Sequence, residues 1–176
     1  MLQPTPPLRH PPGFVPEEAD VLARVAGLPV DLGAMAVGAN LWRAAQAVRT
    51  ELERTVLRPE GLSFTGFSLL FNLWVWGPMQ TRALATSMGC SRATVSSVSD
   101  TLERGGLIAR ADHEHDGRLV ELALTPAGLE LIEEVFPRFN AGESALVSGL
   151  DEQERQTLAG LLRKLVTDVR GGGEPA

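Results

Sequence analysis

Two short helical segments joined at Gly89 constrain the fold of this chain more than any other feature. Leu84, Ala85 and Met88 recur at helical spacing before Gly89, which can adopt the positive φ angle of a tight turn. Ser91 follows the turn and suits the N-cap of a second helix. Two short helices that cross at a glycine turn form a helix-turn-helix, whose second helix fits the major groove of DNA.

The second helix of this motif has an inner and an outer face, and a hairpin follows it. The inner face holds Val95, Val98, Ser99 and Leu102. The outer face holds Arg92, Ala93, Ser96, Ser97, Asp100 and Arg104. Gly105-Gly106 ends the helix, and alternating apolar residues over 119–124 predict a half-buried strand. We therefore expect a two-stranded hairpin that carries Arg110 and Arg118 and acts as a wing toward an adjacent groove.

Helical periodicity extends on both sides of this motif and predicts a mainly α fold with a small β-hairpin wing. Residues 1–16 hold six of the twelve prolines and predict a disordered arm. We expect N-terminal dimerisation helices over 17–61, a winged helix-turn-helix over 62–125, C-terminal dimerisation helices over 126–170 and a disordered tail over 171–176. Within these ranges, helices are expected over 17–26, 31–57, 65–76, 126–146 and 152–169, and the strongly apolar 65–76 should lie at the protein's centre.

The flanking helices carry more apolar surface than the DNA-reading unit between them can cover. The economical arrangement is a homodimer in which the terminal helices of two chains interleave. A twofold dimer would present two recognition helices to a pseudo-palindromic site, about one helical turn of DNA apart.

Charge and composition limit the classes of protein to consider. The chain has a net charge of −6, whereas the segment from Arg82 to Arg118 balances five arginines against five carboxylates. This distribution favours selective, salt-sensitive DNA binding over indiscriminate binding to polyanions. No apolar run approaches the roughly 18 residues that span a membrane, and no secretory signal is recognisable. The single cysteine, Cys90, fits a reducing cytoplasm.

Several short motifs, in this order and spacing, resemble the MarR (multiple antibiotic resistance regulator) family of bacterial winged helix-turn-helix proteins. They are Leu84-Ala85 with Met88-Gly89, Thr94-Val95-Ser96, the run from Leu102 to Arg110, Asp116-Gly117-Arg118, and the run from Leu124 to Gly128. The resemblance implies an obligate dimer, a recognition helix in the major groove and an Arg-tipped wing in the minor groove. It also implies a regulator, more often a repressor of nearby genes, that releases double-stranded DNA when a small molecule binds, often an aromatic acid.

The resemblance assigns the DNA contacts residue by residue. Positions that touch the major groove and phosphates are Ser91, Arg92, Thr94, Ser96 and Ser97, and Arg118 is the wing arginine. Asp116 resembles the acid that orients the wing by pairing with a nearby arginine, for which Arg110 is the candidate. Gly117 departs from the family, where this position is often an arginine, and Ser97 and Asp100 stand where many members carry a cation. Each of these residues could also be an ordinary surface residue.

Aromatic residues cluster before the helix-turn-helix and indicate a ligand pocket. In relatives the pocket lies where the dimer helices meet the DNA-reading unit, and such pockets are mostly apolar with a few polar anchors. The candidates are Trp42, Arg43, Gln46, Phe67, Ser68, Phe71 and Asn72. The alternative is that the aromatic residues are ordinary core.

Two other functions remain as alternatives. The neutral DNA-facing segment allows a winged-helix module that binds proteins without sequence-specific DNA binding. Cys90 precedes the recognition helix and could act as a redox sensor, although a buried structural thiol is the simpler interpretation. His113 and His115 bracket Glu114 in the wing loop, but a metal site needs more ligands. We expect no enzymatic activity, no metal and no cofactor.

Overall fold

The computed structural model describes residues 16–113 and 116–171, apart from the side chains of 16–19, 111–120 and 170–171. It is mainly helical with one small antiparallel sheet, which confirms the expected fold class. The chain forms two compact units, residues 1–47 and 48–176. Among the described residues, no helix has the length and apolar character to cross a membrane.

The first unit holds α1 (Pro16–Val25) and most of α2 (Leu32–Leu52). Asp31 caps α2, since its carboxylate accepts a hydrogen bond of 2.9 Å from the amide of Ala34. Large apolar side chains are exposed on this unit, namely Val21, Leu28, Val30, Leu32, Val37, Leu41 and Trp42. These side chains follow the apolar periodicity that predicted the helices, but the described residues of this unit do not cover them.

The end of α2 winds differently from the single long helix that periodicity predicted. The chain continues from Leu52 as a π-helical turn, η1 (Glu53–Leu57), and a short 3₁₀ turn, η2 (Arg58–Glu60). Gly61 ends this run with a φ angle of 69°, and Ser63 caps the next helix by accepting from the amide of Gly66.

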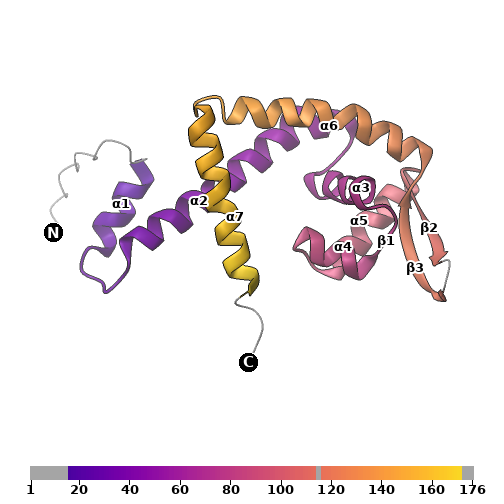
Figure 1. Cartoon of the computed structure of the whole chain (residues 1–176), viewed down its shortest axis with the longest axis horizontal. Coiled ribbons are helices and arrows are strands. Elements are labelled where there is room, and N and C mark those ends of the chain that lie inside the picture. The colour runs from indigo at the N-terminus through magenta and orange to yellow at the C-terminus, as the bar shows by residue number, and fades with distance from the viewer. Residues whose placement is uncertain (1–15, 114–115, 172–176) are drawn as a thin grey trace, which may run out of the picture. The chain divides into compact units, whose positions relative to one another are not determined.

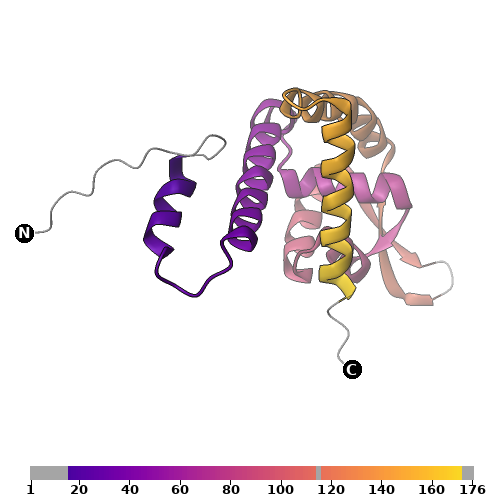
Figure 2. The same ribbon diagram turned by 60° about the vertical axis from the view of Figure 1, so that its left-hand side comes forward.

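Helix α3 (Phe64–Trp76) lies at the centre of the second unit, as its apolar composition predicted. Phe67, Leu69, Leu70 and Leu73 are buried, whereas its last residue, Trp76, is 69% exposed. Figures 1 and 2 both show α6 (Pro126–Leu146) passing over α3, and Phe139 of α6 stacks on Phe67 with ring centroids 4.2 Å apart. These apolar contacts hold the helix-turn-helix on a rigid core.

The two helices of the motif, α4 (Thr81–Met88) and α5 (Arg92–Arg104), each end in a turn, and the two turns have the same hydrogen-bonding pattern. After α4 the amide of Gly89 donates to Thr86, and that of Cys90 donates to Ala85. Gly106 and Leu107 repeat this pattern after α5 by donating to Glu103 and Leu102. Gly89 and Gly106 have φ angles of 62° and 72°, which confirms the left-handed turn expected at Gly89.

The wing belongs to a three-stranded sheet, not to an isolated two-stranded hairpin as predicted. Strands β2 (Ile108–His113) and β3 (Asp116–Leu124) pair, and β1 (Met79–Gln80) adds to the other edge of β3. Met79 stands opposite Leu122 in this pairing. Two residues are too few to show the alternation that reveals a strand, so no sequence pattern indicates β1.

The start of α6 lies unusually close to the turn after the recognition helix. Thr125 caps α6 by accepting from the amide of Gly128, and its hydroxyl donates to the carbonyl of Gly106 at 2.6 Å. A Cβ atom on Gly128 would collide with the carbonyl oxygen of Leu107 and would stand 2.9 Å from its carbonyl carbon. Only glycine therefore allows α6 to begin this close to the end of α5.

The last helix, α7 (Glu152–Gly171), begins at the predicted capping box. The amide of Glu154 donates to the carboxylate of Asp151, and the amide of Asp151 donates to the carboxylate of Glu154, both at 2.8 Å. Its large apolar residues are exposed, namely Leu158, Leu161, Leu165, Val166 and Val169. They recur at helical spacing and form one apolar stripe.

The substitution Gly128→Ala should lower the free energy of unfolding by about 3 kcal/mol, because its methyl group meets backbone that cannot move aside. Gly142→Ala, on the same helix, is the control. Its methyl group would stand 2.5 Å from a terminal methyl of Leu52, the far end of a flexible side chain, so the loss should be smaller than against backbone. Urea unfolding of both variants at one protein concentration measures the difference. Equal losses in the two variants would contradict the close approach at Leu107.

Candidate nucleic-acid interface and adjoining cavity

The N-terminus of the recognition helix α5 is fixed by Ser91. The Ser91 hydroxyl accepts from the amide of Thr94 at 3.0 Å and lies 2.8 Å from the Thr94 hydroxyl. This confirms the predicted N-cap and aligns the two hydroxyls side by side at the exposed start of the helix. Both side chains remain candidates for DNA contacts, since hydroxyls can bind phosphates or base edges as well.

The two faces of α5 are arranged as the sequence predicts. Val95, Ser99 and Leu102 are buried, and the Ser99 hydroxyl is satisfied by donating to the carbonyl of Val95 at 2.7 Å. The predicted DNA-contacting residues Arg92, Ser96 and Ser97 are exposed. These three exposed side chains are therefore accessible to a partner such as a DNA groove.

Arg110 on β2 joins the wing to the recognition helix. Its guanidinium donates to Asp100 at 2.5 Å and to Glu103 at 2.6 Å, both on α5. The hydrogen bond to Asp100, followed by the attraction of both carboxylates, raises the pKa of Arg110 above its ordinary value. Asp100, on the outer face of α5, thus binds an arginine of the same chain.

This pairing bears on the predicted role of Arg110 in DNA binding. With both carboxylates engaged, Arg110 is placed to hold β2 against α5, and we interpret it as a residue that orients the wing. Asp116, the predicted partner of Arg110, and the wing arginine Arg118 have side chains that the structure does not describe. Glu114 and His115 lie entirely outside the described residues. Their roles stay predictions.

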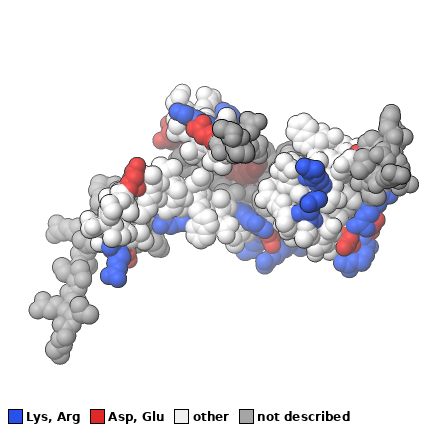
Figure 3. Space-filling model, turned by 90° about the horizontal axis from the view of Figure 1, so that it is seen from below, with Lys and Arg blue, Asp and Glu red and all other residues white. Residues whose placement is uncertain are grey.

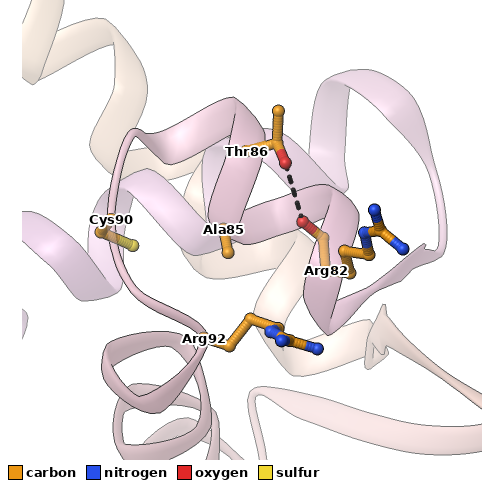
Figure 4. A pocket seen from close by; sticks show the side chains of 5 residues that line it. All are labelled: Arg82, Ala85, Thr86, Cys90 and Arg92. Carbon is orange, nitrogen blue, oxygen red and sulfur yellow. Dashed lines mark hydrogen bonds between the residues drawn. The ribbon is translucent and has the colours of Figure 1, made fainter.

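A shallow basic pocket lies where the turn meets the recognition helix (Figure 4). It has a volume of about 480 Å³ and is lined by Arg82, Ala85, Thr86, Cys90 and Arg92. The Arg82 and Arg92 side chains extend toward the same side of the pocket from α4 and α5. Figure 3 shows basic side chains at several places on one face of the molecule, some on largely uncharged surface and some beside acidic side chains.

A second, larger cavity of about 590 Å³ lies behind the turn. Four phenylalanines supply its apolar walls, namely Phe64, Phe67, Phe71 and Phe139. Its polar lining comes from Arg49, Thr65, Ser68, Asn72, Ser87, Thr94 and Glu143. Met88, Gly89 and Cys90 complete the lining, so the turn of the helix-turn-helix forms part of the cavity wall.

Several polar side chains of this cavity contact one another. The Arg49 guanidinium lies 3.5 Å from the Thr65 hydroxyl and 5.3 Å from the centre of the Phe64 ring. Across the cavity, the Ser87 hydroxyl on α4 donates to the side chain of Asn72 on α3 at 2.5 Å. A cavity with aromatic walls and a few fixed polar groups is typical of a small-molecule site.

The structure divides the predicted pocket residues into two sets. Phe67, Ser68, Phe71 and Asn72 line the cavity. Trp42, Arg43 and Gln46 lie on α2 within the first unit, where Trp42 is 66% exposed and Arg43 donates to Asn40. Their part in a pocket stays a prediction.

Sequence reasoning missed the lining residues that come from distant segments. Arg49, Phe139 and Glu143 lie on helices predicted to serve dimerisation, and Arg82 lies on the first helix of the motif. One signal was available for Arg49, which follows Trp42 by two helical turns and Gln46 by one. No comparable pattern connects residue 139 or 143 with the aromatic cluster.

Cys90 borders both the basic pocket and the cavity. It is half-buried, packs against the hydrophobic core and donates its amide to the carbonyl of Ala85 at 3.1 Å. These contacts are those of a residue that closes the turn, which favours the structural interpretation of its thiol.

Comparison with known proteins places these features in a family. Residues 62–120 match the profile of the MarR family. The HTH-type transcriptional regulator YwaE of Bacillus subtilis (strain 168) is 40% identical over 87% of this chain and 91% of its own length. The transcriptional repressor MprA of Escherichia coli (strain K12) is 30% identical over 69% of this chain and 70% of its own length.

A solved structure agrees with these relatives. BpsR of Bordetella bronchiseptica, whose DNA binding is regulated by 6-hydroxynicotinic acid, superposes with a TM-score of 0.68 at 29% identity. The match covers 74% of this chain and 98% of that protein.

Replacing the helix cap by Ser91→Ala should lower the free energy of unfolding by about 1 kcal/mol, because the amide of Thr94 loses its acceptor. Ser97→Ala is the matched control, since this exposed hydroxyl makes no hydrogen bond within the described residues. Its effect on stability should stay within about 0.5 kcal/mol. Thermal and urea unfolding compare the two variants, and a Ser97→Ala loss as large as that of Ser91→Ala would contradict the cap.

Proposed function

Because this chain belongs to the MarR family of DNA-binding, helix-turn-helix transcriptional regulators, we propose that it acts as a repressor controlled by a small molecule. In this proposal a homodimer binds a pseudo-palindromic operator near its target genes, in the cytoplasm where the chromosome lies. An aromatic acid that enters the cavity behind the turn then releases the DNA. One observation carries the proposal: the turn and start of the recognition helix also line the cavity.

The DNA-reading part of the proposal rests on the outer face of α5. Arg92, Ser96 and Ser97 are exposed there, and the Ser91 and Thr94 hydroxyls mark the helix start. The guanidinium group of an arginine can bind guanine or phosphate, and serine and threonine hydroxyls can contact either. In the proposal Arg118 enters the minor groove, whose negative potential favours an inserted arginine.

The proposal that an effector controls DNA binding rests on residues that belong both to the cavity wall and to the turn before α5. Met88, Gly89, Cys90 and Thr94 line the cavity, and the same segment sets the direction in which α5 leaves the turn. A ligand that shifts this segment changes the placement of the recognition helix relative to DNA. A coupling of about 1–3 kcal/mol would reduce operator affinity roughly 5-fold to 150-fold.

The chemistry of the cavity favours an aromatic acid as effector. Phenylalanine rings form the walls, and Arg49 supplies a cation that can bind a carboxylate. The relative BpsR responds to 6-hydroxynicotinic acid, a compound of this class. Glu143 and the Asn72 amide lie on the same cavity and can bind hydroxyl or ring N–H groups of such a ligand.

The dimer is supported by apolar surface that the chain leaves uncovered. The α7 stripe is exposed, with Val169 at 78%, and further large apolar residues are exposed on α1 and α2. A second copy of the chain is the partner that the family fold provides for these helices. An exposed apolar stripe on a helix, such as that of α7, marks an interaction site.

The test of the proposed function is a gel-shift titration with DNA from the intergenic regions around the gene, in moderate salt with excess competitor. We expect a discrete shift that survives the competitor and is reversed by one member of a panel of aromatic carboxylic acids that includes 6-hydroxynicotinic acid. If neither these fragments nor genome-wide binding selection yields a preferred sequence, the regulator proposal is wrong and the protein-interaction alternative gains support.

Placing a charge in the α7 stripe should separate the dimer. Leu161→Glu would bury a carboxylate against apolar surface, so we expect monomers in sedimentation velocity and at least roughly tenfold weaker operator binding. Gln153→Glu is the control because it adds the same charge on α7 away from the exposed stripe, beside the Thr157 hydroxyl. A Leu161→Glu protein that sediments as a dimer would exclude this stripe from the interface.

Removing the cavity cation should uncouple the effector from DNA binding. Arg49→Gln should raise the concentration of aromatic acid needed for DNA release about tenfold or more, while operator affinity without effector stays unchanged. Arg54→Gln is the control, since Arg54 pairs with Glu51 and does not line the cavity. The assay is the effector titration of the preformed complex by fluorescence anisotropy. An unchanged response in Arg49→Gln would exclude Arg49 as the anchor.

A further inference from the structure

The arginines of the helix-turn-helix and wing whose side chains the structure describes divide into two groups according to their partners. Arg104 donates to the carbonyl of Asp100 and the hydroxyl of Thr101, and Arg110 is held by two carboxylates. The guanidinium groups of Arg82 and Arg92, in contrast, have no hydrogen bond or ion pair with any residue that the structure describes. Both side chains are exposed.

These two unpaired arginines line the same pocket from different helices. Arg82 belongs to the first turn of α4 and Arg92 to the first turn of α5, and Figure 4 shows both extending to one side. The pocket has room for a tetrahedral anion, since its volume is about 480 Å³. Among the residues that the structure describes, no carboxylate lines it, so the two guanidiniums and the N-terminal end of α5 favour an anion there.

We propose that Arg82 and Arg92 together bind the phosphate backbone of DNA at this pocket. A guanidinium presents parallel donors that match the oxygens of a phosphodiester. The pocket lies beside the outer face of α5, so a backbone segment bound there flanks the groove that the recognition helix enters. The inference deepens the proposed function, on which it rests, by adding Arg82, a residue of the first helix, to the DNA-binding surface.

The arrangement also gives the turn a direct effect on DNA affinity. Arg82 precedes the turn and Arg92 follows it, so the turn from Gly89 to Ser91 sets how the two side chains are placed. A shift of this turn would separate the two phosphate-binding groups as well as tilt α5. An effector that shifts the turn would then remove contacts with the DNA phosphates, which contribute much of the affinity for DNA.

The test compares Arg82→Gln, Arg92→Gln and the double variant with the wild-type protein in salt titrations of DNA binding. Two duplexes are used, the selected operator and a random sequence of equal length. We expect each single variant to bind both duplexes about tenfold more weakly at low salt. The slope of log K against log salt should fall by about 0.9 for each phosphate that the dimer no longer neutralises, and twice as far in the double variant.

The control is Arg163→Gln, which removes an exposed arginine of α7 that also lacks a partner within the described residues. Its salt slope should equal that of the wild type. An unchanged slope for Arg82→Gln on both duplexes would overturn the inference, and so would an altered base preference at constant slope. If the wild type does not prefer the operator over random DNA, the proposed repressor function fails, while the slopes on the random duplex still decide the role of Arg82.

Discussion

The turn between α4 and α5 is the constraint on which the rest of the site depends. The left-handed φ angle of Gly89 lets its own amide and that of Cys90 bond back to α4, and Ser91 then caps α5. These few bonds set the angle at which the recognition helix leaves the core. The same residues form a wall of the cavity and, through Cys90 and Arg92, an edge of the basic pocket. One short segment thus adjoins both the surface proposed to bind DNA and the cavity proposed to bind an effector.

Much of the fold could be predicted from the sequence because its local signals are strong. Caps at Ser91, Thr125 and Asp151 and left-handed glycines at 89 and 106 begin or end helices through bonds within a few residues. Features that depend on distant packing have no such signal. The two-residue strand β1 depends on distant packing, because its pairing partner is β3, about 40 residues later in the chain. The close approach of Gly128 to Leu107 likewise joins segments that no local pattern connects.

The position of the candidate site could be predicted from the sequence, but the separate roles of its arginines could not. The outer face of α5 follows from helical periodicity, and its exposure is observed. Charge counting treated the arginines as equivalent, whereas Arg110 is bound to Asp100 and Glu103 while Arg82 and Arg92 are unpaired among the described residues. This difference depends on which carboxylates the folded strands and helices bring close to each arginine, and the pattern of a single element does not show such contacts. The contribution of α6 to the cavity could not be predicted for the same reason.

The central claim is that an effector acts on DNA binding by moving this turn. Amide hydrogen exchange, with and without an aromatic acid that releases the operator, tests it most directly. The account predicts that exchange at Gly89, Cys90 and Thr94 changes on binding, because their amides hold the turn and the helix cap beside the cavity. An effector that releases DNA while these three amides exchange as before, with changes confined to other helices, would contradict the account.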